Sequence, residues 1–165
     1  MVWTALKWSV SLLAMIAIVG ALTRKTFEVE AVIAAPPEAV WSVLMDTAAY
    51  PEWNPVFVEV NGAYVEGERV QNTVRDPSGK LLEMTATVTA LTPERELRQK
   101  GGVPLVITFD HRWNLTPVEG GTLVKQLEVD RGFYLWFWDS DRIEPAYSNV
   151  LGALAGRTQA LAGAD

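Results

Sequence analysis

The sequence predicts an α+β fold in which about seven antiparallel strands form one curved sheet around a long C-terminal helix. Between residues 27 and 130, apolar and polar side chains alternate in short segments separated by turn signals, which is typical of antiparallel strands. From Ile143 onward the apolar residues repeat at helical spacing instead. A sheet with one apolar face must be covered, and only one long helix follows it. We therefore expect this helix to lie in the concave side of the sheet.

The first strand and the helices after it are predicted from residues 27–55. Odd-numbered apolar residues from Phe27 to Ile33 alternate with residues of the other face. The second ring of Pro36-Pro37 can begin a helix, because no N–H is needed at that position. At the exit of this helix pair, we expect Trp53 to pack the helices onto the sheet and Asn54 to bond its own turn. Contact with a ligand is the alternative for both residues.

Six further strands are predicted from alternation and turn residues. They cover residues 56–60, 67–74, 82–90, 96–100, 105–115 and 122–130. Their connections are short, which favours antiparallel pairing. The segment 133–138, FYLWFW, follows them and is a dense apolar run. We interpret it mainly as core under the C-terminal helix; the alternatives are a pocket mouth, a patch that dips into a bilayer, or a protein contact surface.

The C-terminal helix is expected to begin near Ile143, where Asp141 and Glu144 have the spacing of a capping box. Gly152 and Gly156 weaken this helix intrinsically, so packing must hold it. We expect these glycines to mark a close approach to the sheet or to a ligand.

Residues 1–26 differ from the rest of the chain. Residues 8–22 carry no charge, and the apolar stretch extends past Lys7 to residue 2, close to the roughly 20 residues of a membrane-spanning helix. Arg24 and Lys25 close the segment. We expect residues 2–22 to anchor the chain in a membrane as a single span, with a cleaved signal peptide or a buried helix as alternatives. Basic residues at both ends leave the side of the domain unpredicted.

Composition excludes several classes of function. The chain has 165 residues, enough for one domain, and a net charge of −6 with no basic cluster longer than a pair. We therefore expect no nucleic-acid partner, because binding to phosphates needs a basic patch. No cysteine is present, which excludes disulfides and thiolate nucleophiles. With one histidine and no cysteine, neither a metal site nor a cofactor is predicted.

Residues 32–55, VIAAPPEAVWSVLMDTAAYPEWNP, resemble the START-like (SRPBCC) superfamily in the Ala-Pro-Pro-Glu-x-Val-Trp and Tyr-Pro-x-Trp-Asn-Pro elements. That superfamily includes polyketide cyclase/dehydrase-type proteins, coenzyme Q-binding proteins and pollen-allergen-type ligand carriers. The resemblance covers residues 27–163 and implies a helix-grip fold with a cavity between the sheet and the C-terminal helix. It divides the chain into an anchor over residues 1–26 and a ligand-binding domain over residues 27–165. It also implies a bacterial inner-membrane protein.

The expected cavity lining consists of inward residues of two strands and of the C-terminal helix. It comprises Met84, Ala86, Val88, Ile107, Phe109, His111, Trp113, Tyr147, Val150 and Leu154. His111, the only histidine, is expected to be a satisfied core residue, with a catalytic or ligand-contacting role as the alternative. Glu83, Glu128 and Arg112 are candidates for acid–base or ion-pair groups, and Glu83 and Arg112 fall on the predicted outer face.

We expect a membrane-anchored protein that binds an apolar small molecule or lipid, without catalytic residues. The first alternative is a cyclase/dehydratase-like enzyme in which His111 acts as acid–base and Asn72 or Tyr147 orients a carbonyl. The second alternative is a protein-interaction module that uses residues 133–138. The sequence does not predict the identity of the ligand or the oligomeric state.

Overall fold

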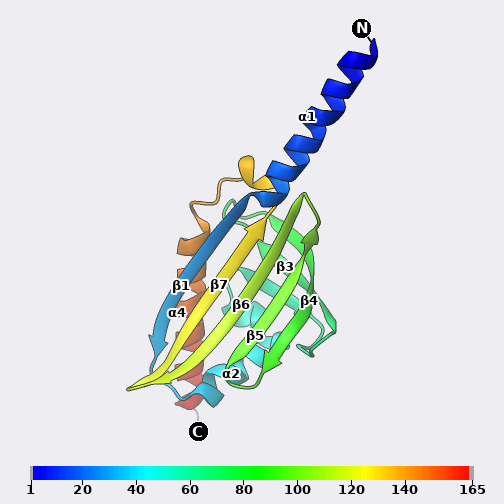
Figure 1. Ribbon diagram of the computed structural model, residues 1–165. Coiled ribbons are helices and arrows are strands. Elements are labelled where there is room, and N and C mark those ends of the chain that lie inside the picture. Colours follow the sequence, from blue (N-terminus) through cyan, green and yellow to red (C-terminus); the bar gives the residue numbers. More distant parts are fainter. Residues whose placement is uncertain (1, 164–165) are drawn as a thin grey trace.

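One seven-stranded antiparallel sheet wraps a single long helix in the computed structural model, which describes residues 2–163 (Figure 1). The helices are α1 (Val2–Leu22), α2 (Pro37–Met45), α3 (Tyr50–Trp53) and α4 (Ile143–Ala162), with 3-10 turns η1 (Thr47–Ala49) and η2 (Phe133–Trp136). The strands are β1 (Arg24–Ile33), β2 (Phe57–Asn61), β3 (Arg69–Arg75), β4 (Leu81–Thr92), β5 (Glu96–Val103), β6 (Ile107–Val118) and β7 (Gly121–Arg131). The predicted α+β class and helix-grip arrangement are confirmed.

The strands are arranged in the order β1-β7-β6-β5-β4-β3-β2, and all six pairings are antiparallel. Strands β2 to β7 therefore form a continuous meander. β1 joins the opposite edge by pairing with β7, so that Arg24 faces Arg131 and Ile33 faces Thr122. This pairing brings the beginning and the end of the domain to one edge of the sheet.

α4 runs along the concave side of the sheet and supplies the apolar cover that the sheet needs (Figure 1). Its Tyr147, Val150, Leu151 and Leu154 are buried and belong to the same core as the inward residues of the strands. Burying each large aliphatic side chain contributes about 2 kcal/mol. The helix is thus held by its apolar stripe, as expected for a sequence weakened by glycine. Gly152 and Gly156 face open space, so the expected close approach at these glycines is wrong.

The helices after β1 close one end of the sheet. Pro37 occupies the first turn of α2, as predicted, and Val40, Val43 and Leu44 of this helix are buried. At the exit, Asn54 is 3% exposed and its Oδ1 accepts the backbone N–H groups of Val56 (3.0 Å) and Phe57 (2.8 Å). The predicted role of Asn54 in its own turn is therefore confirmed.

The predicted capping box of Asp141 and Glu144 is wrong. α4 begins at Ile143 as expected, but its N-cap is Arg142, and no side chain caps the helix. The Glu144 Oε1 atom instead accepts the backbone N–H of Glu28 at 3.2 Å. This hydrogen bond connects α4 to the edge strand β1. Because the Glu144 carboxylate makes this long-range contact, it does not cap its own helix.

The strand predicted from residue 105 begins two residues later, at Ile107. The Val106 N–H donates to the Val103 carbonyl at 3.1 Å, and Leu105 has a φ of 68°. Pro104 precedes Leu105 in this turn, and proline there with a positive φ at the next residue is the pattern of a type II turn. Leu105 is consequently 57% exposed and does not join the inward face of β6.

α1 extends away from the domain as an isolated helix (Figure 1). Its side chains are described from Lys7 onward, Ala21 excepted, and all of these residues are exposed except Gly20. Among the residues whose side chains the structure describes, no helix combines the length and hydropathy that a membrane span requires. Residues 2–6, which belong to the predicted anchor, have side chains outside the described set.

We predict that Asn54→Ala lowers the free energy of unfolding by about 2 kcal/mol, because two buried N–H groups lose their acceptor. Asn54→Asp, which keeps the acceptor oxygen, should cost less. Urea unfolding followed by circular dichroism measures both, with the exposed Asn61→Ala as the control. Equal stabilities of Asn54→Ala and the control would contradict this role.

Candidate functional site

The pairing register of β6 and β7 places a polar cluster inside the protein, against α4. His111 lies opposite Glu128, Trp113 opposite Gln126, and Phe109 opposite Asp130. Side chains at directly paired positions point to the same face of a sheet. Gln126, Glu128 and Asp130 are 0%, 9% and 2% exposed, so this face is the inner one. Three successive inward positions of β7 are therefore polar.

His111 lies at the centre of this cluster and is surrounded by aromatic rings. Its ring centroid is 5.3 Å from that of Phe57, 5.7 Å from that of Trp113 and 5.9 Å from that of Tyr147. These rings come from β2, β6 and α4, so the curl of the sheet brings its edge strand β2 over the imidazole. The surroundings of His111 are apolar on several sides.

The hydrogen bond of His111 determines its tautomer. Its Nε2 atom lies 3.0 Å from Nε2 of Gln126. An amide nitrogen can only donate, so the imidazole Nε2 accepts and the ring proton is on Nδ1. Burial lowers the pKa of His111 to about 4, against the attraction of the Asp110 charge. The imidazole is therefore neutral at pH 7 and presents a buried Nδ1–H donor.

Glu128 and Asp130 form a pair of buried carboxyl groups. Burial raises the pKa of Glu128, and a hydrogen bond from Tyr147 offsets part of this effect. Burial also raises the pKa of Asp130, and the nearby charge of Glu128 raises it further. Two like charges in one apolar site cannot both form cheaply, so at least one carboxyl keeps its proton near neutral pH.

Five buried polar atoms on the inward face have no hydrogen-bond partner among the residues that the structure describes. They are Asn72 Oδ1, Gln99 Nε2, His111 Nδ1, Gln126 Oε1 and Asp130 Oδ1. An unsatisfied buried donor or acceptor costs about 1–3 kcal/mol, so native proteins rarely leave several together. Donors and acceptors are both present, and this set could bind hydroxyl and carbonyl groups of a ligand.

A second polar chain borders the cluster. The side chain of Gln99, which faces His111 across β5 and β6, lies beside the Tyr64 hydroxyl and opposes the rise of its pKa. The Tyr64 ring packs against that of Tyr50, with 6.3 Å between the ring centroids, and the Tyr50 hydroxyl donates to the Leu44 carbonyl at 3.1 Å. Burial raises the pKa of Tyr64 to about 12, so its hydroxyl stays protonated.

Most of the predicted lining residues lie in the interior. Those that are buried are Ala86, Val88, His111, Trp113, Tyr147, Val150 and Leu154. The structure brings His111, Trp113 and Tyr147 into direct ring contact. Met84, Ile107 and Phe109 are only half-buried. The assignment of these residues to a ligand site stays a prediction.

Gln99, Gln126 and Asp130 are site residues that the sequence analysis missed. On β7 the other face carries Leu123, Leu127 and Val129, so hydrophobicity alone favours placing that face inside. The hairpin register overrides this preference. The 118–121 turn sets the register of the hairpin and so places Glu128 opposite His111. Because the sequence predicts that His111 points inward, the same register identifies Glu128 as inward.

On the outer face, Asp110 is the centre of an ion-pair cluster. Its Oδ1 accepts Nε of Arg98 at 2.8 Å and Nε of Arg112 at 3.1 Å, and Lys100 Nζ lies 3.4 Å from its Oδ2. Burial opposes ionisation, but hydrogen bonds from Arg98 and Arg112 hold the pKa of Asp110 well below its usual range. Of the two candidates on the outer face, Arg112 thus pairs with Asp110, whereas Glu83 bonds Gln71 (3.2 Å) and Thr73 (3.1 Å).

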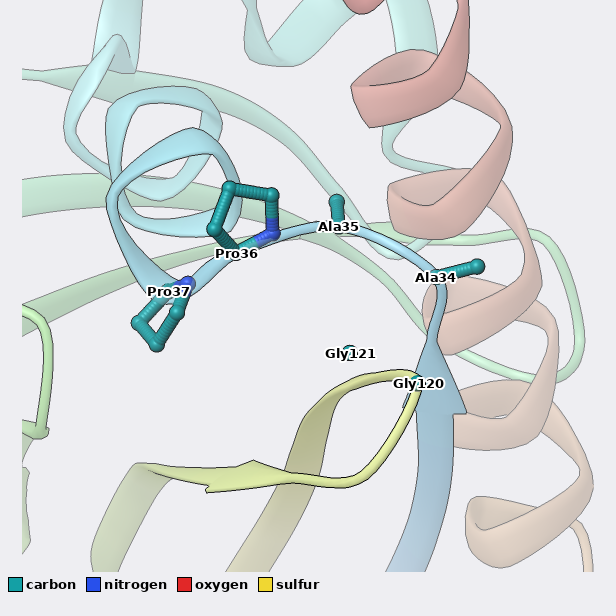
Figure 2. A pocket seen from close by; sticks show the side chains of 6 residues that line it. All are labelled: Ala34, Ala35, Pro36, Pro37, Gly120 and Gly121. Atoms are coloured by element: carbon teal, nitrogen blue, oxygen red, sulfur yellow. The ribbon is translucent and has the colours of Figure 1, made fainter.

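A hollow of about 370 Å³ lies elsewhere, between the start of α2 and the β6–β7 turn. Figure 2 shows its lining, which consists of Ala34, Ala35, Pro36, Pro37, Gly120 and Gly121. These residues offer methyl groups and proline rings but no polar side chain, and none belongs to the predicted site. Among the described residues, no group of three His, Asp or Glu side chains could hold a metal ion. The interior cluster around His111 is therefore the candidate site.

Comparison with known proteins agrees with this architecture. The sequence matches the family described as polyketide cyclase / dehydrase and lipid transport over residues 24–159, which is most of the chain. The chain belongs to this family. The predicted START-like resemblance is thereby confirmed, and the polar cluster lies within the matched region. No protein with a curated description matches the sequence.

Solved structures share the fold of this polyketide cyclase/dehydrase family member. A Rhodobacter sphaeroides protein is 22% identical, with a TM-score of 0.67 over 86% of this chain and 95% of that one. The di-domain ARO/CYC StfQ of the steffimycin biosynthetic pathway is 13% identical, with a TM-score of 0.69 over 85% of this chain and 52% of its own. Ara h 8.0201 is 14% identical, with a TM-score of 0.63 over 84% and 99% of the two chains. At these identities the similarity shows the fold alone.

We predict that the NMR titration midpoint of the single histidine lies below pH 5. The unfolded chain binds a proton near pH 6.5 and the folded chain only near pH 4, so stability falls as the pH falls between these values. Between pH 7 and pH 5, the wild type should lose about 2 kcal/mol more than His111→Gln in urea unfolding. An ordinary midpoint near 6.5 would show that the imidazole is solvated.

Proposed function

We propose that this protein binds a small amphiphilic or lipid-like molecule between the sheet and α4. The observation that carries the proposal is the set of five unpartnered buried polar atoms on the inward face of the sheet, one of which is His111 Nδ1. The two donors are Gln99 Nε2 and His111 Nδ1, and the three acceptors are the oxygens of Asn72, Gln126 and Asp130. A ligand with a mainly apolar body and a few hydroxyl or carbonyl oxygens would satisfy them. Membership in a family described by lipid transport supports this class of ligand.

The same proposal includes attachment of the domain to a membrane through α1. Apolar side chains of this helix are exposed on several sides, among them Leu13 at 66% and Ile18 at 60%. Large exposed apolar surfaces are rare in monomeric soluble proteins and mark contacts with membranes or partners. Attachment to the membrane would bring the binding domain close to its ligands, because lipid-like molecules concentrate in the bilayer. Removal of residues 1–26 as a signal peptide is the alternative.

Native mass spectrometry of the full chain, purified in detergent and incubated with total bacterial lipid extract, tests ligand binding. We predict a bound apolar species that carries hydroxyl or carbonyl groups. Gln126→Leu should weaken binding about five- to thirtyfold, because one or two hydrogen bonds of roughly 1 kcal/mol each are lost along with the orientation of His111. The half-buried Gln71, on the outer face of β3, provides the matched control Gln71→Leu. A protein that never takes up a ligand would refute the proposal.

A second candidate function is catalysis of a dehydration or cyclisation at the same site. The coupled Glu128 and Asp130 carboxyls favour it, because a pair that shares one proton supplies an acid and a base side by side. His111 would then not be the base that the sequence suggested, since its Nε2 is occupied by Gln126. Its Nδ1–H would donate to a substrate carbonyl. Tyr147 would hold Glu128 in place.

The enzyme hypothesis predicts turnover of an aromatic β-hydroxyketone to the conjugated enone, measured by absorbance. Asp130→Asn should lower kcat by about 10²-fold, the usual contribution of a general acid or base. The exposed Asp141→Asn should leave the rate unchanged. Binding of the probe without turnover in the wild type would favour a carrier over an enzyme.

A further inference from the structure

An apolar collar lies beside the base of α1. It consists of Val103 at the end of β5, of Leu105 in the turn to β6, and of Phe133, Tyr134, Trp136 and Phe137 in and after η2. These side chains are between 37% and 76% exposed, with Phe133 at the lower limit and Phe137 at the upper. The interpretation of residues 133–138 as core is thus wrong for four of the six, while Leu135 is buried and Trp138 packs on Phe27. The turn and η2 are joined by the Phe133 and Tyr134 N–H groups, which donate to the carbonyls of Leu105 and Val106.

α1 is fixed to this collar rather than tethered by a loose linker. Gly20 is buried against Phe133, and a Cβ atom there would lie 2.7 Å from the Phe133 Cβ. The Trp136 indole N–H donates to the Thr23 hydroxyl at 2.8 Å, and the Gly132 N–H donates to the Thr23 carbonyl at 3.2 Å. The close contact at Gly20 and the bonds at Thr23 set the direction in which α1 leaves the domain (Figure 1). The apolar surfaces of α1 and of the collar are therefore continuous.

Two arginines lie at the rim of the collar in an unfavourable arrangement. Arg24 and Arg131 occupy directly opposite positions of β1 and β7, and both are exposed. Like charges at such positions repel each other. Among the described residues, the ion pairs within 4.0 Å involve other basic side chains, so neither guanidinium has a carboxylate partner there. A bound anion between them would relieve the repulsion and accept bidentate hydrogen bonds.

We propose that the collar docks on the surface of a bilayer that contains anionic phospholipid. The apolar side chains of the collar enter the interface, and Arg24 and Arg131 bind headgroup phosphates. The inference rests on the proposed attachment through α1, and adds to it a second, specific contact that fixes the tilt of the domain. Trp136 and Tyr134 have the amphipathic rings that membrane interfaces select, and the continuity with α1 favours a bilayer over a protein partner.

The absence of cysteine from the chain makes a direct test possible. Single-cysteine variants Phe137→Cys, Leu105→Cys, Ile16→Cys and Val118→Cys of the full chain are labelled with an environment-sensitive fluorophore. They are reconstituted in vesicles of equimolar phosphatidylcholine and phosphatidylglycerol that contain a shallow nitroxide-labelled lipid. Val118 ends β6 at the opposite end of the sheet and is the control (Figure 1). We expect strong quenching at residues 137, 105 and 16, and none at residue 118.

The phosphate contact of Arg24 and Arg131 is tested in the variant that carries the label at Phe137→Cys. Arg24→Glu or Arg131→Glu should reduce quenching at residue 137 at least about twofold in phosphatidylglycerol vesicles, because a repulsion replaces a phosphate contact. Quenching of a label at residue 16 should not change. Arg95→Glu, in the turn before β5, is the matched control and should have no effect.

The outcomes separate this inference from the proposed anchor. Quenching at residue 16 without quenching at residues 137 and 105 overturns the collar contact and leaves the anchor in place. No quenching at any site, with the protein free in solution, refutes both. Quenching at residues 137 and 105 that is unaffected by Arg24→Glu and Arg131→Glu overturns the assignment of the phosphate contact. A label at residue 118 that is quenched like the others overturns the docking face.

Discussion

The register of the β6–β7 hairpin is the constraint on which the interior of this protein depends. The hairpin turns through Gly120 and Gly121, and a Cβ atom at Gly121 would lie 2.0 Å from the Ile33 carbonyl oxygen. Glycine therefore permits both the turn and the close approach of β1. Because side chains alternate along a strand, a slip of one residue would move Gln126, Glu128 and Asp130 to the surface and Leu127 and Val129 inside. The observed register is held by β1 on one side and β6 on the other, and it keeps the less apolar face of β7 against α4.

This choice carries an energetic cost that points to function. A core of Leu127 and Val129 would bury apolar surface, whereas the actual core buries two carboxyl groups and several unpartnered amide and imidazole atoms. Raised carboxyl pKa values and a neutral imidazole reduce the charge but do not provide hydrogen-bond partners. Conflicts between local preference and global fold are expected mainly at functional sites. The rings of Phe57, Trp113 and Tyr147 surround His111 with apolar surface, so a ligand of the proposed kind would meet polar groups at only a few points.

Much of the architecture could be predicted from the sequence, because strand alternation, the Pro36-Pro37 break and the stripe of α4 are local signals. The same holds for Asn54, whose bonds reach only to its own turn. The polar site could be predicted only in part. His111 and Tyr147 stand out by type, but the inward position of Asp130 follows from long-range register and not from hydrophobicity. Exposure of residues 133–138 was predicted only as an alternative to the core for a related reason, since an apolar run looks the same whether α4 covers it or leaves it exposed. Glu144 shows the converse, a local capping pattern overruled by a contact with β1.

The pairing of β1 with β7 has a consequence for the order in which the chain folds. Strands β2 to β7 are neighbours in sequence and can pair as successive hairpins. The ladder between β1 and β7, in which Arg24 faces Arg131, can form only after the whole segment between them has been synthesised. Closing so long a loop costs conformational entropy, and proteins dominated by such non-local contacts fold slowly. During synthesis, β1 would leave the ribosome with its edge bare, directly after an apolar helix. If α1 entered a membrane first, β1 would be fixed in position while strands β2 to β7 paired with one another. Pairing of β1 with β7, and with it assembly of the interior, would then be the final step of biogenesis.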